Sequence, residues 1–267
     1  MAELVFIGLG LHDEQDMSLR GLSEAKEAES VFVELYTSLM SGLQTEKLGR
    51  LIGKKVTQVS RRALEDESGT TILQAAMKGK TVLLVPGDLM IATTHINLRL
   101  RAEERGITTR IVHGATIVSA VCGATGLQNY KFGRSVTIPF AYKGCTSDSP
   151  YEVIKHNLDD GLHTLCFLDL DVEENRYLTL NEALESLLNI EKKKPKFTIS
   201  LDTFAVGLAR LGSSEQVVKA DTVKRLKAHD FGNPPHTLIF PGKLHFMEAE
   251  ALITLAKAPH RIRNQKR

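Results

Sequence analysis

The sequence contains few cysteines, and these lie far apart. Cys122, Cys145 and Cys166 are three in a chain of 267 residues, and no two of them form a C-x-x-C pair. Such a set argues against both a disulfide framework and a structural zinc site. We therefore expect no metal, and a reducing compartment such as the cytoplasm.

The sequence also lacks a large net charge and long apolar segments. The 34 Lys and Arg residues balance 32 Asp and Glu residues, and a net charge of +2 gives no broad positive field for nucleic acid. No apolar run approaches the roughly 18 residues of a membrane-spanning helix. The start, Met1–Glu3, lacks the positive region of a signal peptide. We expect a soluble protein without membrane or direct nucleic-acid contacts.

The last eight residues, His260–Arg267, are a local basic exception. A segment of this kind could bind RNA or an acidic protein surface. We favour a frayed, solvated terminus, which is common at chain ends.

Short apolar segments alternate with helical patterns along the chain. In the first half, the strongest predicted strands are residues 4–7, 30–36, 81–85 and 109–112. Their nearly continuous apolar character is typical of a parallel sheet covered on both faces. Further strands and helices follow, so the sequence predicts an α/β fold with an N-terminal lobe, 1–112, and a C-terminal lobe, 113–267.

Glycine turns follow several of these strands. Gly8-Leu9-Gly10 matches only part of a dinucleotide fingerprint, because residue 13 is Asp rather than Gly or Ala, and this argues against NAD. Pro86-Gly87-Asp88 and His113-Gly114 end two other strands, and parallel sheets bind ligands at such ends. The turns predict one ligand cleft. Two alternatives stay open: turns without any ligand, and Asp88 as a helix N-cap.

The sequence lacks the usual signatures of covalent catalysis. There is no G-x-S-x-G elbow, no phosphate-binding G-x-x-x-x-G-K-[ST] loop and no cysteine in a reactive context. The catalytic residues therefore stay unknown. His236 is the favoured ligand contact in the second lobe, because Pro234 and Pro235 fix the backbone before it.

Segments in the same order over nearly the whole chain resemble the diphthine synthases, which belong to the tetrapyrrole methylase class. The matching segments include Phe6–Leu11, Tyr36–Ser38, Ala92–His95, Tyr130–Gly133, Ala209–Ser213 and Pro241–His245. Leu89 departs from this family, which usually has proline there, and a less rigid turn is expected.

The resemblance implies two α/β lobes of the tetrapyrrole methylase type, with the cofactor cleft between them, and a homodimer. It implies S-adenosyl-L-methionine as methyl donor and S-adenosyl-L-homocysteine as product. Carried over position by position, the cofactor contacts are Leu11, Asp88, Ile91, Thr116, Ile117, Leu168, Leu211 and His236.

The implied reaction is trimethylation of the modified histidine of translation elongation factor 2, a step of diphthamide biosynthesis. Eukaryotic members of the family add a further methyl ester, and the motifs do not fix the number of methyl groups. One alternative is a methylase of the same class acting on a tetrapyrrole or on ribosomal RNA. A non-catalytic interaction module is the other, and it would explain the basic tail but not the turns.

Overall fold

The chain folds into two compact units. The computed structural model describes residues 1–141, 147–172, 174–196 and 198–264, so Cys145 and the last three residues of the basic tail lie outside the described residues. The N-unit comprises Met1–Ile117 and the C-unit Val118–Arg267. The sequence-based division after residue 112 falls five residues earlier, at the end of the fifth strand.

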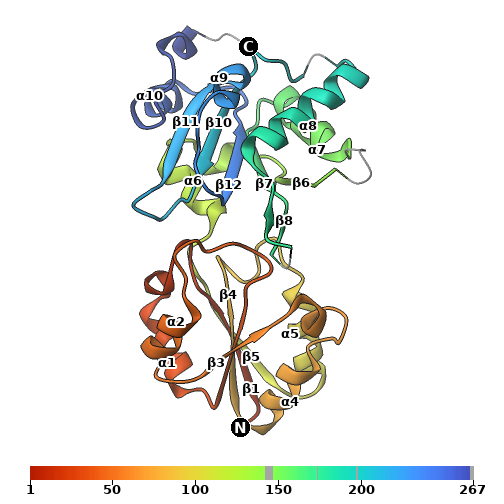
Figure 1. Cartoon of the computed structure of the whole chain (residues 1–267), viewed down its shortest axis with the longest axis vertical. Helices are drawn as coiled ribbons and strands as arrows, with labels where there is room; N and C mark the ends of the chain where they lie inside the picture. Colours follow the sequence, from red (N-terminus) through yellow and green to blue (C-terminus); the bar gives the residue numbers. More distant parts are fainter. Residues whose placement is uncertain (142–146, 173, 197, 265–267) are drawn as a thin grey trace. The chain divides into compact units, whose positions relative to one another are not determined.

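The N-unit is a parallel sheet with the strand order β3-β2-β4-β1-β5. The strands are β1 (Glu3–Gly8), β2 (Ser30–Glu34), β3 (Val56–Val59), β4 (Lys80–Val85) and β5 (Thr108–Val112). The helices are η1 (Glu14–Asp16), α1 (Leu19–Glu27), α2 (Thr45–Ile52), α3 (Arg61–Leu64), α4 (Thr70–Lys78) and α5 (His95–Glu104). α1 and α2 cover one face of the sheet, and α4 and α5 cover the other (Figure 1).

The central strand β1 shows why its sequence is continuously apolar. Leu4 and Phe6 pack with α4 and α5, whereas Val5 and Ile7 pack with α1 and α2. All four side chains are fully buried. Alternate residues of a strand point to opposite faces, so a strand covered on both sides needs apolar residues at every position. The predicted covered parallel sheet is confirmed.

The C-unit is built around a mixed sheet with the order β11-β10-β12-β7-β6, in which only the β6 and β7 pair is parallel. Its strands are β6 (Val136–Ile138), β7 (Thr164–Leu168), β10 (Phe204–Ala209), β11 (Val217–Thr222) and β12 (His236–Phe240), and β8 (Leu170–Asp171) pairs separately with β9 (Arg176–Tyr177). Its helices are α6 (Ile117–Thr125, beginning at the last residue of the N-unit), η2 (Asn129–Lys131), α7 (Ser149–Asp159), α8 (Leu180–Lys193), α9 (Val223–Lys227), α10 (Phe246–Leu255) and η3 (His260–Asn264).

The described part of the basic tail is ordered. Ile262 in η3 is buried, and the Arg263 guanidinium donates to both carboxylate oxygens of Glu250 at 2.5 and 2.6 Å. The basic side chains His260, Arg261 and Arg263 are exposed to solvent, as expected, but the segment forms the helix η3 instead of a frayed end and buries Ile262. Within the described residues, no helix is long and apolar enough to cross a membrane.

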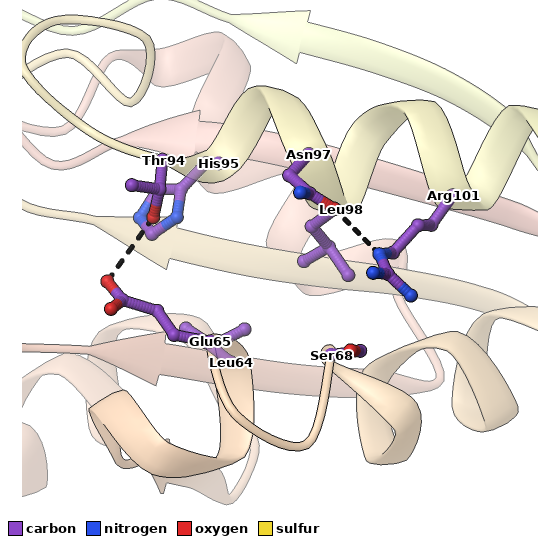
Figure 2. Close-up of a pocket in the computed structure, with 8 residues that line it drawn as sticks. All are labelled: Leu64, Glu65, Ser68, Thr94, His95, Asn97, Leu98 and Arg101. Carbon is purple, nitrogen blue, oxygen red and sulfur yellow. Dashed lines mark hydrogen bonds between the residues drawn. The ribbon is translucent and has the colours of Figure 1, made fainter.

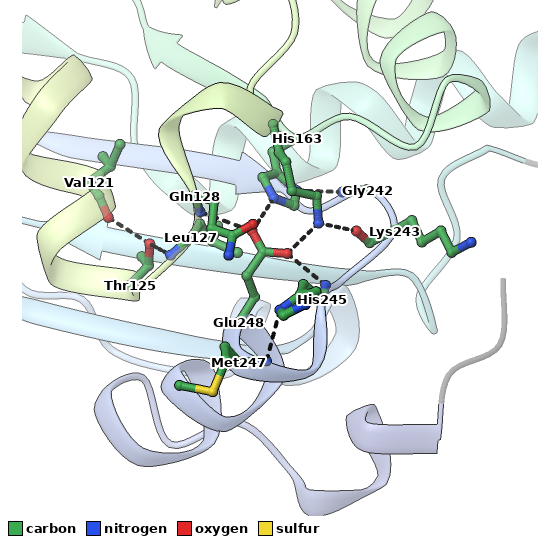
Figure 3. A network of polar contacts seen from close by, with 11 residues as sticks. Val121, Thr125, Leu127, Gln128, His163, Gly242, Lys243, His245, Met247 and Glu248 are labelled. Atoms are coloured by element: carbon green, nitrogen blue, oxygen red, sulfur yellow. Dashed lines mark hydrogen bonds and ion pairs between the residues drawn. The ribbon is translucent and has the colours of Figure 1, made fainter.

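A buried carboxylate organises one end of the C-unit (Figure 3). Glu248, at the start of α10, is fully buried and accepts from His163 Nε2 at 2.9 Å, from the Gln128 amide at 2.9 Å and from the Lys131 ammonium. His163 donates from Nε2 because its Nδ1 accepts the Gly242 amide at 2.9 Å. One side chain thus joins α10, η2 and the segment before β7.

The same contacts set the ionisation of Glu248. Burial on its own would raise the pKa of this carboxyl, but donation by His163, Gln128, Lys131 and His245 outweighs it and lowers the pKa to about 2. A carboxylate with a lowered pKa stabilises the fold above its unfolded-state value near 4.5. That contribution is lost as pH falls through about 2.

We predict that Glu248→Gln lowers the unfolding free energy at neutral pH by about 1.5–3 kcal/mol, the usual worth of hydrogen bonds to a charged group. Urea denaturation at a series of pH values measures this. The difference from wild type should shrink as pH falls from about 4.5 to about 2. Glu250→Gln on the same helix is the control, because its ion pair with Arg263 is exposed and should matter little. A difference that is independent of pH would contradict the assignment.

Candidate functional site

The turns that follow β1, β4 and β5 meet at the carboxyl edge of the N-unit sheet. These three strands are neighbours in the sheet. Beyond their ends, the Leu9 amide donates to the Val85 carbonyl at 2.7 Å. Gly10 and Gly87 then exchange two hydrogen bonds, of 3.2 and 2.7 Å. The predicted convergence of the strand-end turns within the N-unit is therefore present in the structure.

Glycine is required where these turns touch. A Cβ atom on Gly8 would lie 2.6 Å from both the Gly87 carbonyl oxygen and the Gly114 nitrogen. One on Gly114 would lie 2.5 Å from the same carbonyl oxygen. Both obstacles are backbone atoms, which cannot move aside as a flexible side chain can. Three backbone segments of the chain therefore pack directly against one another.

Asp88 lies beside this contact and is almost completely buried. One carboxylate oxygen accepts the Met90 amide at 3.1 Å, and the other lies 2.7 Å from Nδ1 of His113. α5 begins only at His95, with Thr94 in the capping position. The alternative of Asp88 as the N-cap of that helix is therefore wrong, and its carboxylate instead joins the turn after β4 to the turn after β5.

Leu89, where the family usually has proline, is anchored by burial. Its side chain is fully buried in the core that includes Phe6. Its carbonyl accepts the Thr93 hydroxyl at 2.6 Å, and the Ile91 amide donates to the Asp88 carbonyl at 3.0 Å. The turn therefore has internal hydrogen bonds that hold it without a proline ring, and it leaves Ile91 exposed.

The loop after β1 is organised by an acidic residue that the sequence reasoning did not single out. One carboxylate oxygen of Asp16 accepts the amides of Leu11 at 3.0 Å and His12 at 2.7 Å. The Leu11 amide is therefore occupied, so any ligand contact at Leu11 uses its carbonyl or its side chain. An acidic residue within six positions of a glycine turn is a signal that could have suggested this role.

Glu34, at the end of β2, is a second residue that was missed. It is fully buried, and it accepts the amides of Tyr36 at 3.0 Å and Thr37 at 3.1 Å. Its other oxygen lies 3.0 Å from Nε2 of His95, the first residue of α5. The His95 ring therefore anchors the start of α5 to the end of β2.

A separate hollow of about 210 Å³ lies between α5 and the segment that joins α3 to α4. Figure 2 shows the Thr94 hydroxyl bonded to Glu65 across it, and Arg101 bonded to Asn97 on the same helix. None of the predicted cofactor contacts lines this hollow. We therefore do not assign it to the cofactor.

The three predicted contacts of the C-unit lie at one edge of its sheet. His236 begins β12 and pairs with Ala209, two residues before Leu211. The next residue of β12, Thr237, pairs with Phe167, which precedes Leu168. Antiparallel pairing thus brings together the end of β7, the turn after β10 and the start of β12.

The His236 ring is held by the protein itself. Its Nδ1 accepts the Leu180 amide at 3.2 Å, and its Nε2 donates to the Gly232 carbonyl at 3.1 Å. Burial lowers its pKa, which favours the neutral ring that this pattern requires. With both nitrogens occupied, His236 can contact a ligand only through its backbone or its ring face. Among the described residues, no group of His, Cys, Asp and Glu could hold a metal ion.

Comparison with known proteins identifies the family. Residues 3–227 match the Tetrapyrrole (Corrin/Porphyrin) Methylases. A diphthine synthase of Methanosarcina acetivorans is 50% identical over 97% of this chain and 98% of its own length, and one of Methanocella arvoryzae is 47% identical over 95% and 98%. This chain belongs to the diphthine synthase family. A crystal structure of a diphthine synthase, 43% identical, covers 98% of both chains with a TM-score of 0.88.

Membership of the diphthine synthase family makes this chain an S-adenosylmethionine-dependent methyltransferase. The resemblance inferred from the ordered motifs is confirmed, and so is the α/β fold of the tetrapyrrole methylase class. The near-complete matches to diphthine synthases do not favour the alternative of a tetrapyrrole or ribosomal RNA substrate. The non-catalytic module is not supported either.

We predict that Gly8→Ala destabilises this diphthine synthase family member by about 1–3 kcal/mol, as expected for overpacking. Thermal unfolding measures the change. Gly123→Ala is the matched control, since its Cβ would meet nothing within 4 Å. Because Gly123 lies within α6, alanine there should stabilise by about 0.5–1 kcal/mol. Equal unfolding temperatures for Gly8→Ala and wild type would show that the three turns tolerate separation.

Proposed function

We propose that this chain transfers three methyl groups from S-adenosyl-L-methionine to the amine of the modified histidine of translation elongation factor 2. The observation that carries this proposal is the 50% identity to a diphthine synthase over nearly the full length of both chains. The number of methyl groups and the elongation factor as partner rest on the family resemblance.

We propose that the cofactor is held by the residues named from the resemblance. In the N-unit, the buried Asp88 carboxylate suits hydroxyl or ammonium groups, and the exposed Ile91 supplies an apolar surface. A Cβ atom on Gly87 would meet nothing within 4 Å, so the backbone there is open to close approach. Leu11 and Thr116 lie on the neighbouring turns, and Ile117 begins α6. Leu168, Leu211 and His236 are the proposed contacts of the C-unit. This mixture of carboxylate, backbone and apolar groups fits an adenosyl and methionyl ligand.

The chemistry that follows needs positioning more than covalent catalysis. The sulfonium supplies an already activated methyl group. The protein must align the acceptor amine with the methyl carbon and exclude water. The amine must be neutral to attack, and burial favours the neutral form of an amine.

We also propose that the enzyme works as a cytoplasmic homodimer. α6 carries no charged residue, and α10 leaves Phe246 and Leu255 largely exposed. A Cβ atom on Gly126, which follows α6, would touch Ala251 of α10, so the two helices adjoin. Exposed apolar side chains of this kind suit a second copy of the same chain, because the same apolar patch on two copies can pair with itself.

We predict that Asp88→Ala weakens the binding of S-adenosyl-L-homocysteine at least about tenfold, the loss of a charged hydrogen bond worth about 1.5–3 kcal/mol. Titration calorimetry measures the affinity. Asp88→Asn keeps an oxygen for the Met90 amide and removes only the charge, so a similar loss in both variants assigns the effect to the carboxylate. Unchanged affinity in both would restrict Asp88 to a structural role in its turn.

The proposed function is tested by incubating the purified protein with labelled cofactor and elongation factor 2 that bears the unmethylated precursor. We expect three methyl groups on the elongation factor, counted by intact mass. A fourth methyl group would indicate the additional ester. No transfer to the factor, together with label on a tetrapyrrole, would overturn the substrate assignment.

A further inference from the structure

His113 combines a fixed orientation with exposure at the edge of the site. Its side chain is 72% exposed, while its Nδ1 lies 2.7 Å from the Asp88 carboxylate, which is 8% exposed. The other Asp88 oxygen is fixed by the Met90 amide. A buried acid therefore holds an exposed imidazole by one of its two nitrogens.

The contact with Asp88 determines which nitrogen of the His113 ring can accept a proton. An ionised carboxylate can only accept hydrogen bonds, so the neutral His113 ring carries its proton on Nδ1. The lone pair is then on Nε2, on the side of the ring away from Asp88. A carboxylate that fixes the tautomer and orientation of an imidazole in this way is the arrangement that general bases use.

His113 lies on the same turn as the proposed cofactor contact Thr116, and its Nδ1 is bonded to the proposed contact Asp88. His113 directly follows β5 and precedes Thr116 by three residues. Gly114, the next residue, packs against Gly8 and Gly87. The other two histidines near these strand ends are less exposed. The His12 ring packs on Gly42, and His95 is buried against Glu34.

We propose that His113 is the base that removes the proton from the acceptor amine, with Asp88 as its positioning residue. This inference rests on the proposed function, since the amine belongs to the methyl-accepting histidine derivative. It assigns Asp88 a second task besides contact with the cofactor.

The proton balance of the reaction requires such an acceptor at every transfer. The alkylammonium gives one proton to His113 Nε2, which frees the nitrogen lone pair. A nitrogen–carbon bond then forms while the carbon–sulfur bond breaks, and its electron pair stays on sulfur, giving S-adenosyl-L-homocysteine. His113 passes its proton to water because the ring is exposed. The methylated ammonium must lose a proton again before the next transfer, until the quaternary product has none.

The experiment compares wild type with His113→Ala and His113→Gln, using the full chain, labelled cofactor and the precursor-bearing elongation factor. His156→Ala, an exposed histidine of α7, is the control. We expect both His113 variants to bind S-adenosyl-L-homocysteine as wild type does in calorimetry, and to transfer methyl groups about 100-fold more slowly or worse, since general bases contribute about 10²–10⁴-fold. Added imidazole should restore part of the rate of His113→Ala and leave His156→Ala unchanged.

Nitrogen NMR of the histidine rings gives a readout that does not depend on turnover. The neutral His113 ring should show its proton on Nδ1, and Asp88→Asn should abolish this preference. Wild-type rates in His113→Ala would overturn the proposal. So would a slow variant that imidazole does not rescue, or a ring protonated on Nε2. An inactive wild type would instead overturn the proposed function, and this inference with it.

Discussion

The direct contact between three backbone segments, at Gly8, Gly87 and Gly114, is the constraint on which the rest of the N-unit site depends. With no side chains between them, the turns after β1 and β4 are hydrogen-bonded to each other, and the turn after β5 packs against both. Every predicted contact of the N-unit lies on or just beyond one of these turns. The parallel sheet supplies three neighbouring strand ends, and glycine removes the atoms that would separate the loops leaving them.

Acidic side chains then fix the shape of the loops. Asp16 accepts two amides of the loop after β1, Glu34 accepts two amides after β2, and Asp88 accepts one after β4. In each case a carboxylate replaces the backbone partners that a regular helix or strand would provide. Loops ordered in advance lose less entropy when a ligand binds, which suits an enzyme whose main task is alignment.

The sequence predicted the strands and helices best where both faces of an element are covered. The predicted strands 4–7 and 81–85 match β1 and β4 to within one residue at each end, because both strands are buried on both faces. β6 and β11 were missed, and both are edge strands of the C-unit sheet, where polar residues such as Lys219 interrupt the pattern. For the site, the motifs indicated Asp88 and its turn. They could not show that His95 turns to Glu34, since that contact spans 61 residues.

Burial separates the side chains of this edge by role. Glu34 and Asp88 are buried, so their charges must be met by fixed donors, and each accepts backbone amides of its own loop and faces one histidine ring. In the C-unit, both nitrogens of the His236 ring are bonded to backbone groups. His113 differs, because the part of the chain that the structure describes bonds only its Nδ1 and leaves the ring exposed. A site that requires no nucleophile still has to remove a proton at each transfer, and among these side chains His113 alone combines an anchored ring with an exposed nitrogen.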